Sequence, residues 1–157
     1  MCAMITGIHH ASITTPNLER AIAFYSGLLG MEVVVRWDWK AGNTAADSIY
    51  GLKDTAVNMA MLKTGNAFLE LFEFESPTGT PNEAQRPVCN AGVTHVCLTV
   101  TDIHAEYQRL LAAGVKFNCP PQTMPGILTA TYARDPDGNI FELLEPDSNG
   151  PFAMPSA

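Results

Sequence analysis

The chain has 157 residues, a length that suggests one domain or two small repeats sharing one core. Apolar residues make up 46% and charged residues only 16%, against a usual charged share of about 25%, which argues against disorder. Basic side chains number 9 and acidic ones 16, for a formal charge of −7. The basic residues form no cluster along the sequence that could replace the counterions of a nucleic acid, so we expect no nucleic-acid partner.

The cysteines and the first residues indicate the compartment. Cys2, Cys89, Cys97 and Cys119 form no CxxC pair, and residues 1–6 lack the charged start and apolar run of a signal peptide. We therefore expect free thiols in a reducing cytoplasm. No stretch approaches about 18 consecutive apolar residues, so we expect no membrane partner either.

The first part of the chain predicts a strand, a helix and three more strands. The helix follows Asn17, a suitable cap, and ends at Gly30, a suitable left-handed stop. The strands are predicted at Gly7–Thr15, Glu32–Trp37, Ala56–Leu62 and Ala67–Phe74. Within this part, Trp37–Thr55 is expected to be an irregular insert, acting as a substrate lid, as an interface loop or through plain aromatic packing.

The second part of the chain predicts the same series of elements, without the insert. Asp102 caps its helix and Gly114 ends it. Its strands are predicted at Gly92–Val100, Val115–Asn118, Leu128–Arg134 and Asn139–Glu145. Gly7–Leu18 can be laid over Gly92–Ile103, and Ala67–Glu73 over Asn139–Glu145, so the chain repeats itself.

The repeat predicts an α+β fold in which a βαβββ module occurs twice. The first module is placed at residues 5–75, a linker at 76–91, the second module at 92–146 and a C-terminal tail at 147–157. If the two sheets join into one curved mixed sheet, they form a cup.

Strand parity puts four metal-binding side chains on one surface, because residues two apart on a strand share a face. His10 and His95 occupy equivalent places on the first strands, and Glu70 and Glu142 occupy equivalent places on the last strands. Two imidazoles and two carboxylates suit one divalent first-row metal ion: Ni, Co, Zn, Mn or Fe. His9 aligns with Thr94, is expected to point to the opposite face from His10, and is expected to be structural or exposed.

Other side chains on these faces are expected to line a substrate pocket beside the metal. They are Ser12, Phe72, Phe74, Cys97 and Thr99. The two phenylalanines share the face of Glu70 and would give the pocket an apolar wall.

These residues resemble the vicinal oxygen chelate superfamily, which includes glyoxalase I, methylmalonyl-CoA epimerase, extradiol dioxygenases and fosfomycin/bleomycin resistance proteins. The matching segments are His10–Ile13, Asn17–Tyr25, Leu28–Met31, Leu69–Phe72, His95–Val96 and Asp135–Leu143. The resemblance implies paired βαβββ modules forming a cup around a metal, with the ligands at His10, Glu70, His95 and Glu142. It also implies a small-molecule substrate with two adjacent oxygens.

Within that superfamily, the carboxylate at Glu70 favours a lyase or isomerase of the glyoxalase I or epimerase type. Such an enzyme removes a proton next to a chelated carbonyl and stabilises the resulting enediolate, with Glu142 or Glu70 as the base. The basic residue that binds glutathione in glyoxalase I is replaced by threonine at Thr14 and Thr15.

Two alternatives stay open, an extradiol-type dioxygenase using His10, His95 and Glu142, and a non-catalytic binding or resistance protein of the same fold. A large apolar surface is expected between modules, within or between chains. We therefore expect a homodimer.

Overall fold

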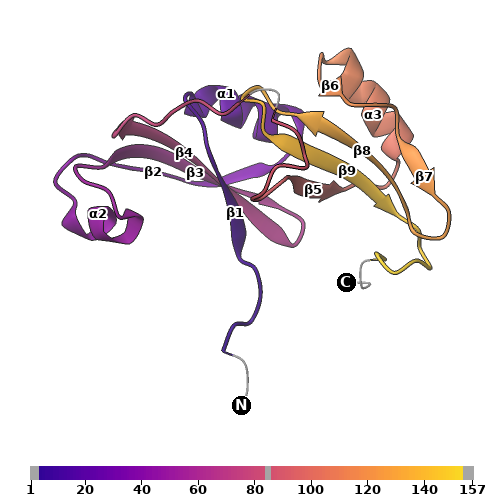
Figure 1. Cartoon of the computed structure of the whole chain (residues 1–157), viewed down its shortest axis with the longest axis horizontal. Coiled ribbons are helices and arrows are strands. Elements are labelled where there is room, and N and C mark those ends of the chain that lie inside the picture. Colours follow the sequence, from indigo (N-terminus) through magenta and orange to yellow (C-terminus); the bar gives the residue numbers. More distant parts are fainter. Residues whose placement is uncertain (1–3, 84–85, 154–157) are drawn as a thin grey trace. The chain divides into compact units, whose positions relative to one another are not determined.

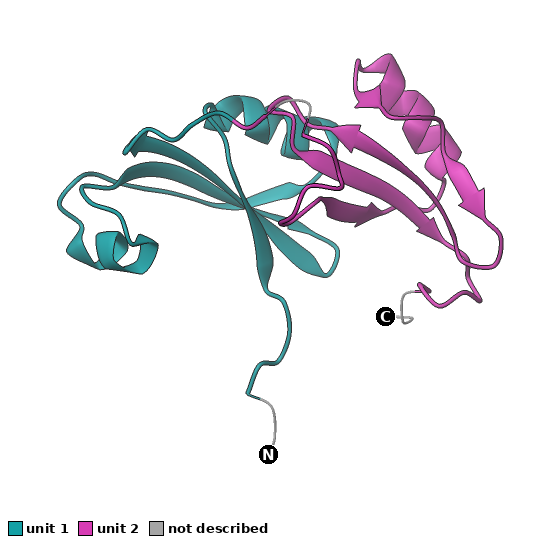
Figure 2. Cartoon of the chain, viewed as in Figure 1, with its two compact units in different colours: residues 1–81 teal, residues 82–157 magenta. Residues whose placement is uncertain are grey.

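The computed structural model describes residues 4–83 and 86–153. It divides the chain between Pro81 and Asn82 into two compact units, unit 1 and unit 2 (Figure 2). Each unit has its own mixed sheet with helical segments, so the predicted α+β class is confirmed. No helix in the described ranges is both long and apolar enough to cross a membrane.

Unit 1 contains a four-stranded sheet in the order β1-β4-β3-β2 (Figure 1). Strand β1 runs parallel to β4, and the other neighbours are antiparallel. The elements of unit 1 are β1 (His10–Thr14), α1 (Leu18–Ile22), the π-helix η1 (Ala23–Leu28), β2 (Glu32–Trp39), α2 (Thr44–Tyr50), β3 (Ala56–Thr64) and β4 (Ala67–Ser76).

Unit 2 repeats the arrangement with a five-stranded sheet in the order β5-β9-β8-β6, in which β7 also pairs with β8. Strand β5 is parallel to β9, as β1 is to β4. The elements of unit 2 are β5 (Val96–Thr99), α3 (Ile103–Ala112), β6 (Lys116–Phe117), β7 (Gln122–Met124), β8 (Leu128–Arg134) and β9 (Ile140–Pro146).

The first helix of each unit is held at its N-terminus in the same way. The Asn17 side chain accepts a hydrogen bond from Arg20 N, and Asp102 does the same for Ala105 N. The last strand of each unit then supplies a carboxylate. Oε2 of Glu73 accepts from Leu18 N at 3.1 Å, and Oε2 of Glu145 accepts from Ile103 N at 3.0 Å.

The cores lie between each helix and the face of the sheet that carries no predicted ligand. In unit 1, Leu62 and Leu71 are fully buried on this face. In unit 2, Phe141 and Leu143 alternate with Glu142 along β9 and are buried in the same way. Burial of these apolar side chains selects one register, because a shift by one residue would expose them.

Several predicted boundaries differ from the structure. Strand β1 begins at His10 rather than Gly7, and β5 at Val96 rather than Gly92, because each pairs with a strand that starts nearby and has no partner farther back. The segment Trp37–Thr55 is not irregular: β2 extends through Trp39, and α2 follows it. A short strand, β7, was not predicted, since it has only three residues, two of them polar, and is flanked by prolines.

The described cysteines Cys89, Cys97 and Cys119 are free thiols. The expectation for Cys2 lies outside the described residues, as does the end of the predicted C-terminal tail beyond residue 153.

Candidate functional site

In unit 1, the structure brings together His10 and Glu70. His10 is the first residue of β1, and Glu70 lies in the middle of β4 beside Ser12. Nε2 of His10 lies 3.4 Å from Oε2 of Glu70. The side chain of Glu70 is 14% exposed and that of His10 is 37% exposed, so the pair is open on the histidine side.

In unit 2, the structure brings together His95 and Glu142. His95 immediately precedes β5, and Cys97 lies beside Glu142 in the register of β5 and β9. Nε2 of His95 lies 3.0 Å from Oε2 of Glu142. Each unit thus holds one predicted His–Glu pair, with the same two atoms facing each other.

The other ring nitrogen of each histidine, Nδ1, makes a hydrogen-bond contact with the side chain of the preceding residue. Nδ1 of His10 lies 2.8 Å from Nδ1 of His9, and Nδ1 of His95 lies 2.9 Å from Oγ1 of Thr94. When each Nδ1 carries the proton and donates it to that neighbour, each Nε2 keeps its lone pair beside the carboxylate. His9 and Thr94 thus each contact the ring nitrogen that is not beside the carboxylate.

The predicted pocket residues divide between the two units. Ser12, Phe72 and Phe74 share the Glu70 face of unit 1. Cys97 and Thr99 share the Glu142 face of unit 2. Loss of hydration, the charge of Glu142 and a hydrogen bond to it raise the pKa of the Cys97 thiol to about 12, so this thiol stays protonated at neutral pH.

Two tyrosines adjoin the pairs and were not predicted as site residues. The ring of Tyr132, opposite Glu142 on β8, lies 4.9 Å from the ring of His95. Tyr50 sits at the end of α2, and burial followed by the charge of Glu70 raises the pKa of its phenol. Strand parity could have identified Tyr132, whereas Tyr50 belongs to the insert, for which the repeat offers no counterpart.

Within residues 4–83 and 86–153, no three or more His, Cys, Asp or Glu side chains form a group that could hold a metal ion. Each unit alone supplies two donors, an imidazole nitrogen and a carboxylate oxygen. Both donor types suit a divalent first-row metal, but two ligands fall short of a complete protein site.

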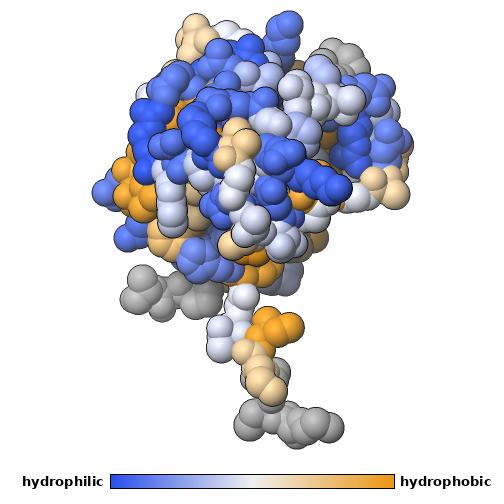
Figure 3. All heavy atoms as spheres, turned by 90° about the vertical axis from the view of Figure 1, so that its left-hand side faces the viewer, coloured by the Kyte–Doolittle hydropathy of each residue, from blue (hydrophilic) through white to orange (hydrophobic). Residues whose placement is uncertain are grey.

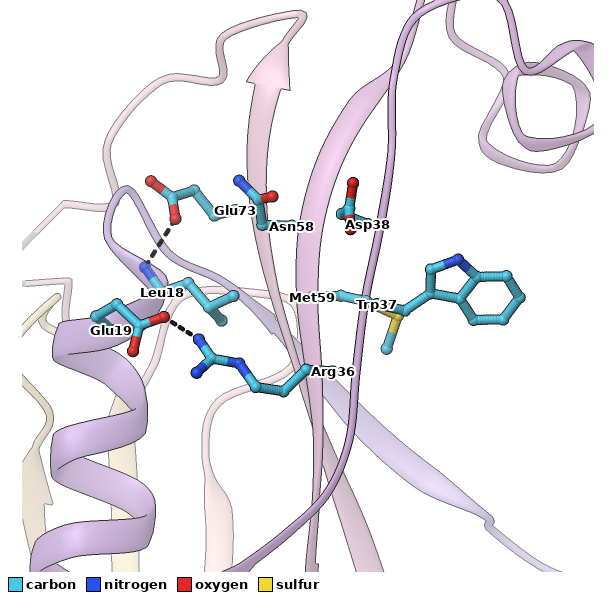
Figure 4. A pocket seen from close by; sticks show the side chains of 8 residues that line it. All are labelled: Leu18, Glu19, Arg36, Trp37, Asp38, Asn58, Met59 and Glu73. Atoms are coloured by element: carbon cyan, nitrogen blue, oxygen red, sulfur yellow. Dashed lines mark hydrogen bonds and ion pairs between the residues drawn. The ribbon is translucent and has the colours of Figure 1, made fainter.

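A separate pocket of about 430 Å³ opens in unit 1 (Figure 4). Three of its four charged side chains already make contacts that hold the fold. Glu73 accepts the hydrogen bond from Leu18 N, and Glu19 pairs with Arg36. Trp37 is 67% exposed and lines the pocket, whose lining includes no member of either predicted His–Glu pair.

Comparison with protein families gives one match over most of the chain. The sequence profile of the Glyoxalase/Bleomycin resistance protein/Dioxygenase superfamily matches residues 7–143. This range contains both His–Glu pairs.

Individual relatives are distant but cover nearly the full length. A 2-epi-5-epi-valiolone epimerase from Actinomyces sp is 27% identical, over 92% of this chain and 82% of its own. A lactoylglutathione lyase from Pseudomonas aeruginosa is 29% identical, over 90% of this chain and 84% of its own. The crystal structure of a glyoxalase family protein from Bacillus cereus matches with a TM-score of 0.82 at 25% identity, covering 92% of this chain and 96% of that one.

Proposed function

Since the chain belongs to the Glyoxalase/Bleomycin resistance protein/Dioxygenase superfamily, we propose that it is a divalent-metal-dependent lyase or isomerase acting on a small substrate with two adjacent oxygens. The relatives that are an epimerase and a lyase support an enzyme of this kind.

One observation carries the proposal. Both units place Nε2 of a histidine against Oε2 of a glutamate, and in both the preceding residue occupies Nδ1. The same Nε2–Oε2 contact at equivalent places of a repeat points to a shared use. We assign His10, Glu70, His95 and Glu142 as ligands of a Ni, Co, Zn, Mn or Fe ion, with the two pairs that share it coming from one chain or from two chains of a dimer.

A metal held by these residues would supply positive charge that makes the carbon next to a bound carbonyl more acidic. The chain itself supplies the proton acceptor. Glu70 and Glu142 are the candidates, because each carboxylate lies on the face where the substrate pocket is proposed. Ser12 and Thr99 offer hydroxyls on these faces, while the high pKa of Cys97 makes its thiol a neutral lining group rather than a base.

Metal stoichiometry tests the ligand assignment. We expect calorimetry of the metal-free chain with Ni²⁺ or Co²⁺ to give one ion per chain, and Glu70→Ala and His95→Ala each to weaken it at least tenfold. Matched controls are Glu73→Gln and Glu145→Gln, since these carboxylates lie three residues farther along the same strands and contact helix N-termini instead. Two ions per chain, or equal losses in the controls, would contradict one shared site.

Proton exchange tests the reaction class. The metal-loaded protein should catalyse deuterium incorporation from D₂O next to the carbonyl of small α-hydroxy ketones, followed by NMR. Whichever of Glu70→Gln and Glu142→Gln retains metal but loses exchange identifies the base. Oxygen consumption with a catechol, unaffected by Glu70→Ala, would instead support the dioxygenase alternative.

We also propose that the protein is a homodimer in the cytoplasm. The N-terminal segment before β1 runs away from the sheet of unit 1 with apolar side chains in the open (Figures 1 and 3). Met4, Ile5 and Ile8 are 96%, 88% and 92% exposed, which favours a covering surface from another chain. A monomer in sedimentation at micromolar concentration would contradict the dimer.

A further inference from the structure

The insert between β2 and β3 gives unit 1 a wall that unit 2 lacks. Helix α2 begins after Asn43, whose side chain accepts from Ala46 N, and ends at Gly51 with φ +65°, a left-handed stop. Tyr50 is its last residue. The helix therefore delivers one aromatic side chain at a defined place.

Helix α2 is tied to the sheet by hydrogen bonds around one aspartate. The carboxylate of Asp47 accepts from Thr55 N at 2.8 Å, Thr55 Oγ1 at 2.6 Å and Asp54 N at 2.9 Å. Thr55 is fully buried, and its Oγ1 also accepts from Nε1 of Trp39 at 3.0 Å. These bonds connect α2 to β2 and to the start of β3, so the insert forms a fixed wall rather than a lid that swings.

Tyr50 packs into a ring cluster on the Glu70 face of the sheet. Its ring stacks on Trp39 at 5.7 Å and meets Phe72 and Phe74 edge-on at 5.8 and 6.0 Å. Phe72 lies two residues after Glu70 on β4 and so shares its face. The charge of Glu70 reaches the Tyr50 phenol and contributes to its raised pKa.

The cluster is apolar throughout, yet it is not closed. Phe72 is 6% exposed, while Tyr50 keeps 38% of its surface open. Val57, Met59 and Met61 complete the cluster beneath the rings, and none of these seven side chains carries a charge. A carboxylate or phosphate placed here would lose its hydration without gaining a cation, whereas an uncharged ring would gain apolar and edge-to-face contacts.

We propose that the α2 wall, with Tyr50 as its open member, selects substrates that carry an uncharged aromatic ring as a substituent next to their two chelating oxygens. This inference rests on the proposed function, since it places the ring beside a metal that binds the two oxygens. It assigns Tyr50 a specificity role that neither the repeat nor strand parity predicts.

Three hydroxamates test the inference, because they share one chelating group and differ only in what it carries. Calorimetry of the full-length, Ni²⁺-loaded protein should show benzohydroxamate binding about tenfold more tightly than acetohydroxamate. A 4-carboxybenzohydroxamate should bind more weakly than benzohydroxamate. Tyr50→Ala should remove most of the tenfold preference and leave the affinities for Ni²⁺ and acetohydroxamate unchanged.

Tyr107→Ala is the matched control, since Tyr107 packs edge-on against Phe117 in unit 2 at 4.7 Å. Equal affinities of the first two compounds, tighter binding of the carboxylate, or a preference that survives Tyr50→Ala would overturn the inference while Ni²⁺ still binds. Failure to bind Ni²⁺ and acetohydroxamate would refute the proposed function. In that case NMR titration of the metal-free protein with benzamide still tests whether the α2 wall binds an uncharged ring. Binding that depends on Tyr50 supports the inference, and absence of binding overturns it.

Discussion

The carboxylate of Glu73 should contribute measurably to the stability of unit 1, because it holds the start of α1. It accepts from Leu18 N, on a residue only 3% exposed (Figure 4). Glu73→Ala leaves that N–H without its partner, which costs about 1–3 kcal/mol. It also removes a negative charge near the positive end of the helix, a further loss of about 0.3–1 kcal/mol. We expect the free energy of unfolding to fall by about 2 kcal/mol.

Thermal unfolding followed by circular dichroism measures this loss. For a chain of this length, 1 kcal/mol corresponds to a shift of about 2–4 °C, so Glu73→Ala should lower the midpoint by about 4–8 °C. Glu73→Gln keeps an acceptor oxygen and loses only the charge, so its shift should be less than half as large. Glu145→Ala should repeat the full effect in unit 2, where Ile103 N is the donor.

Glu32→Ala provides the control, since Glu32 is an exposed carboxylate at the start of β2. If Glu73→Ala and Glu145→Ala unfold at the same temperature as Glu32→Ala, the hydrogen bonds to the helix starts contribute nothing and the argument is wrong. If Glu73→Gln is as damaging as Glu73→Ala, the charge matters more than the hydrogen bond.

Three further predictions concern the candidate site and its wall. His9→Ala removes the group that holds Nδ1 of the neighbouring imidazole, so metal affinity measured by calorimetry should fall about 10–100-fold, with unchanged affinity counting against this role. In the metal-free protein at pH 8, Cys97, with its pKa near 12, should react with iodoacetamide at least about tenfold more slowly than the exposed Cys89, and equal rates by mass spectrometry would contradict the high pKa. The hydrogen bonds from Thr55 lower the pKa of Asp47, so the stability that these bonds give is present above the unfolded pKa of about 3.9 and is lost as the pH falls through the folded pKa. In a Trp37→Phe background, the fluorescence of Trp39 should therefore change only in that acid range. In Asp47→Asn this change should disappear.

The repeat made most of the fold and both His–Glu pairs predictable. His10 matches His95 and Glu70 matches Glu142, and strand parity then places each pair on one face, where the structure brings the two members within 3.4 and 3.0 Å. Strand parity predicts the faces correctly because buried apolar residues alternate with the two glutamates on β4 and β9 and specify the register.

The insert was not predictable in the same way. Helix α2 is only seven residues long, too short to be stable by propensity alone. It depends on hydrogen bonds made outside the helix, in which Thr55 donates to Asp47 and Trp39 donates to Thr55. No local sequence pattern indicates these bonds. The contacts of His9 and Thr94 were missed for a related reason. Both precede their strands, where strict alternation of side chains no longer applies.

The spacing of the two glutamates on each last strand links assembly of the fold to chemistry. Glu70 and Glu73, like Glu142 and Glu145, are three residues apart, so on a strand they point to opposite faces. One carboxylate meets a histidine and the other caps a helix. Sliding β4 by a single residue would send each carboxylate to the wrong side of the sheet. A chain that misfolds in this way would lose the helix hydrogen bond and the His–Glu contact together, so the packing that selects the register also orients the proposed metal ligand.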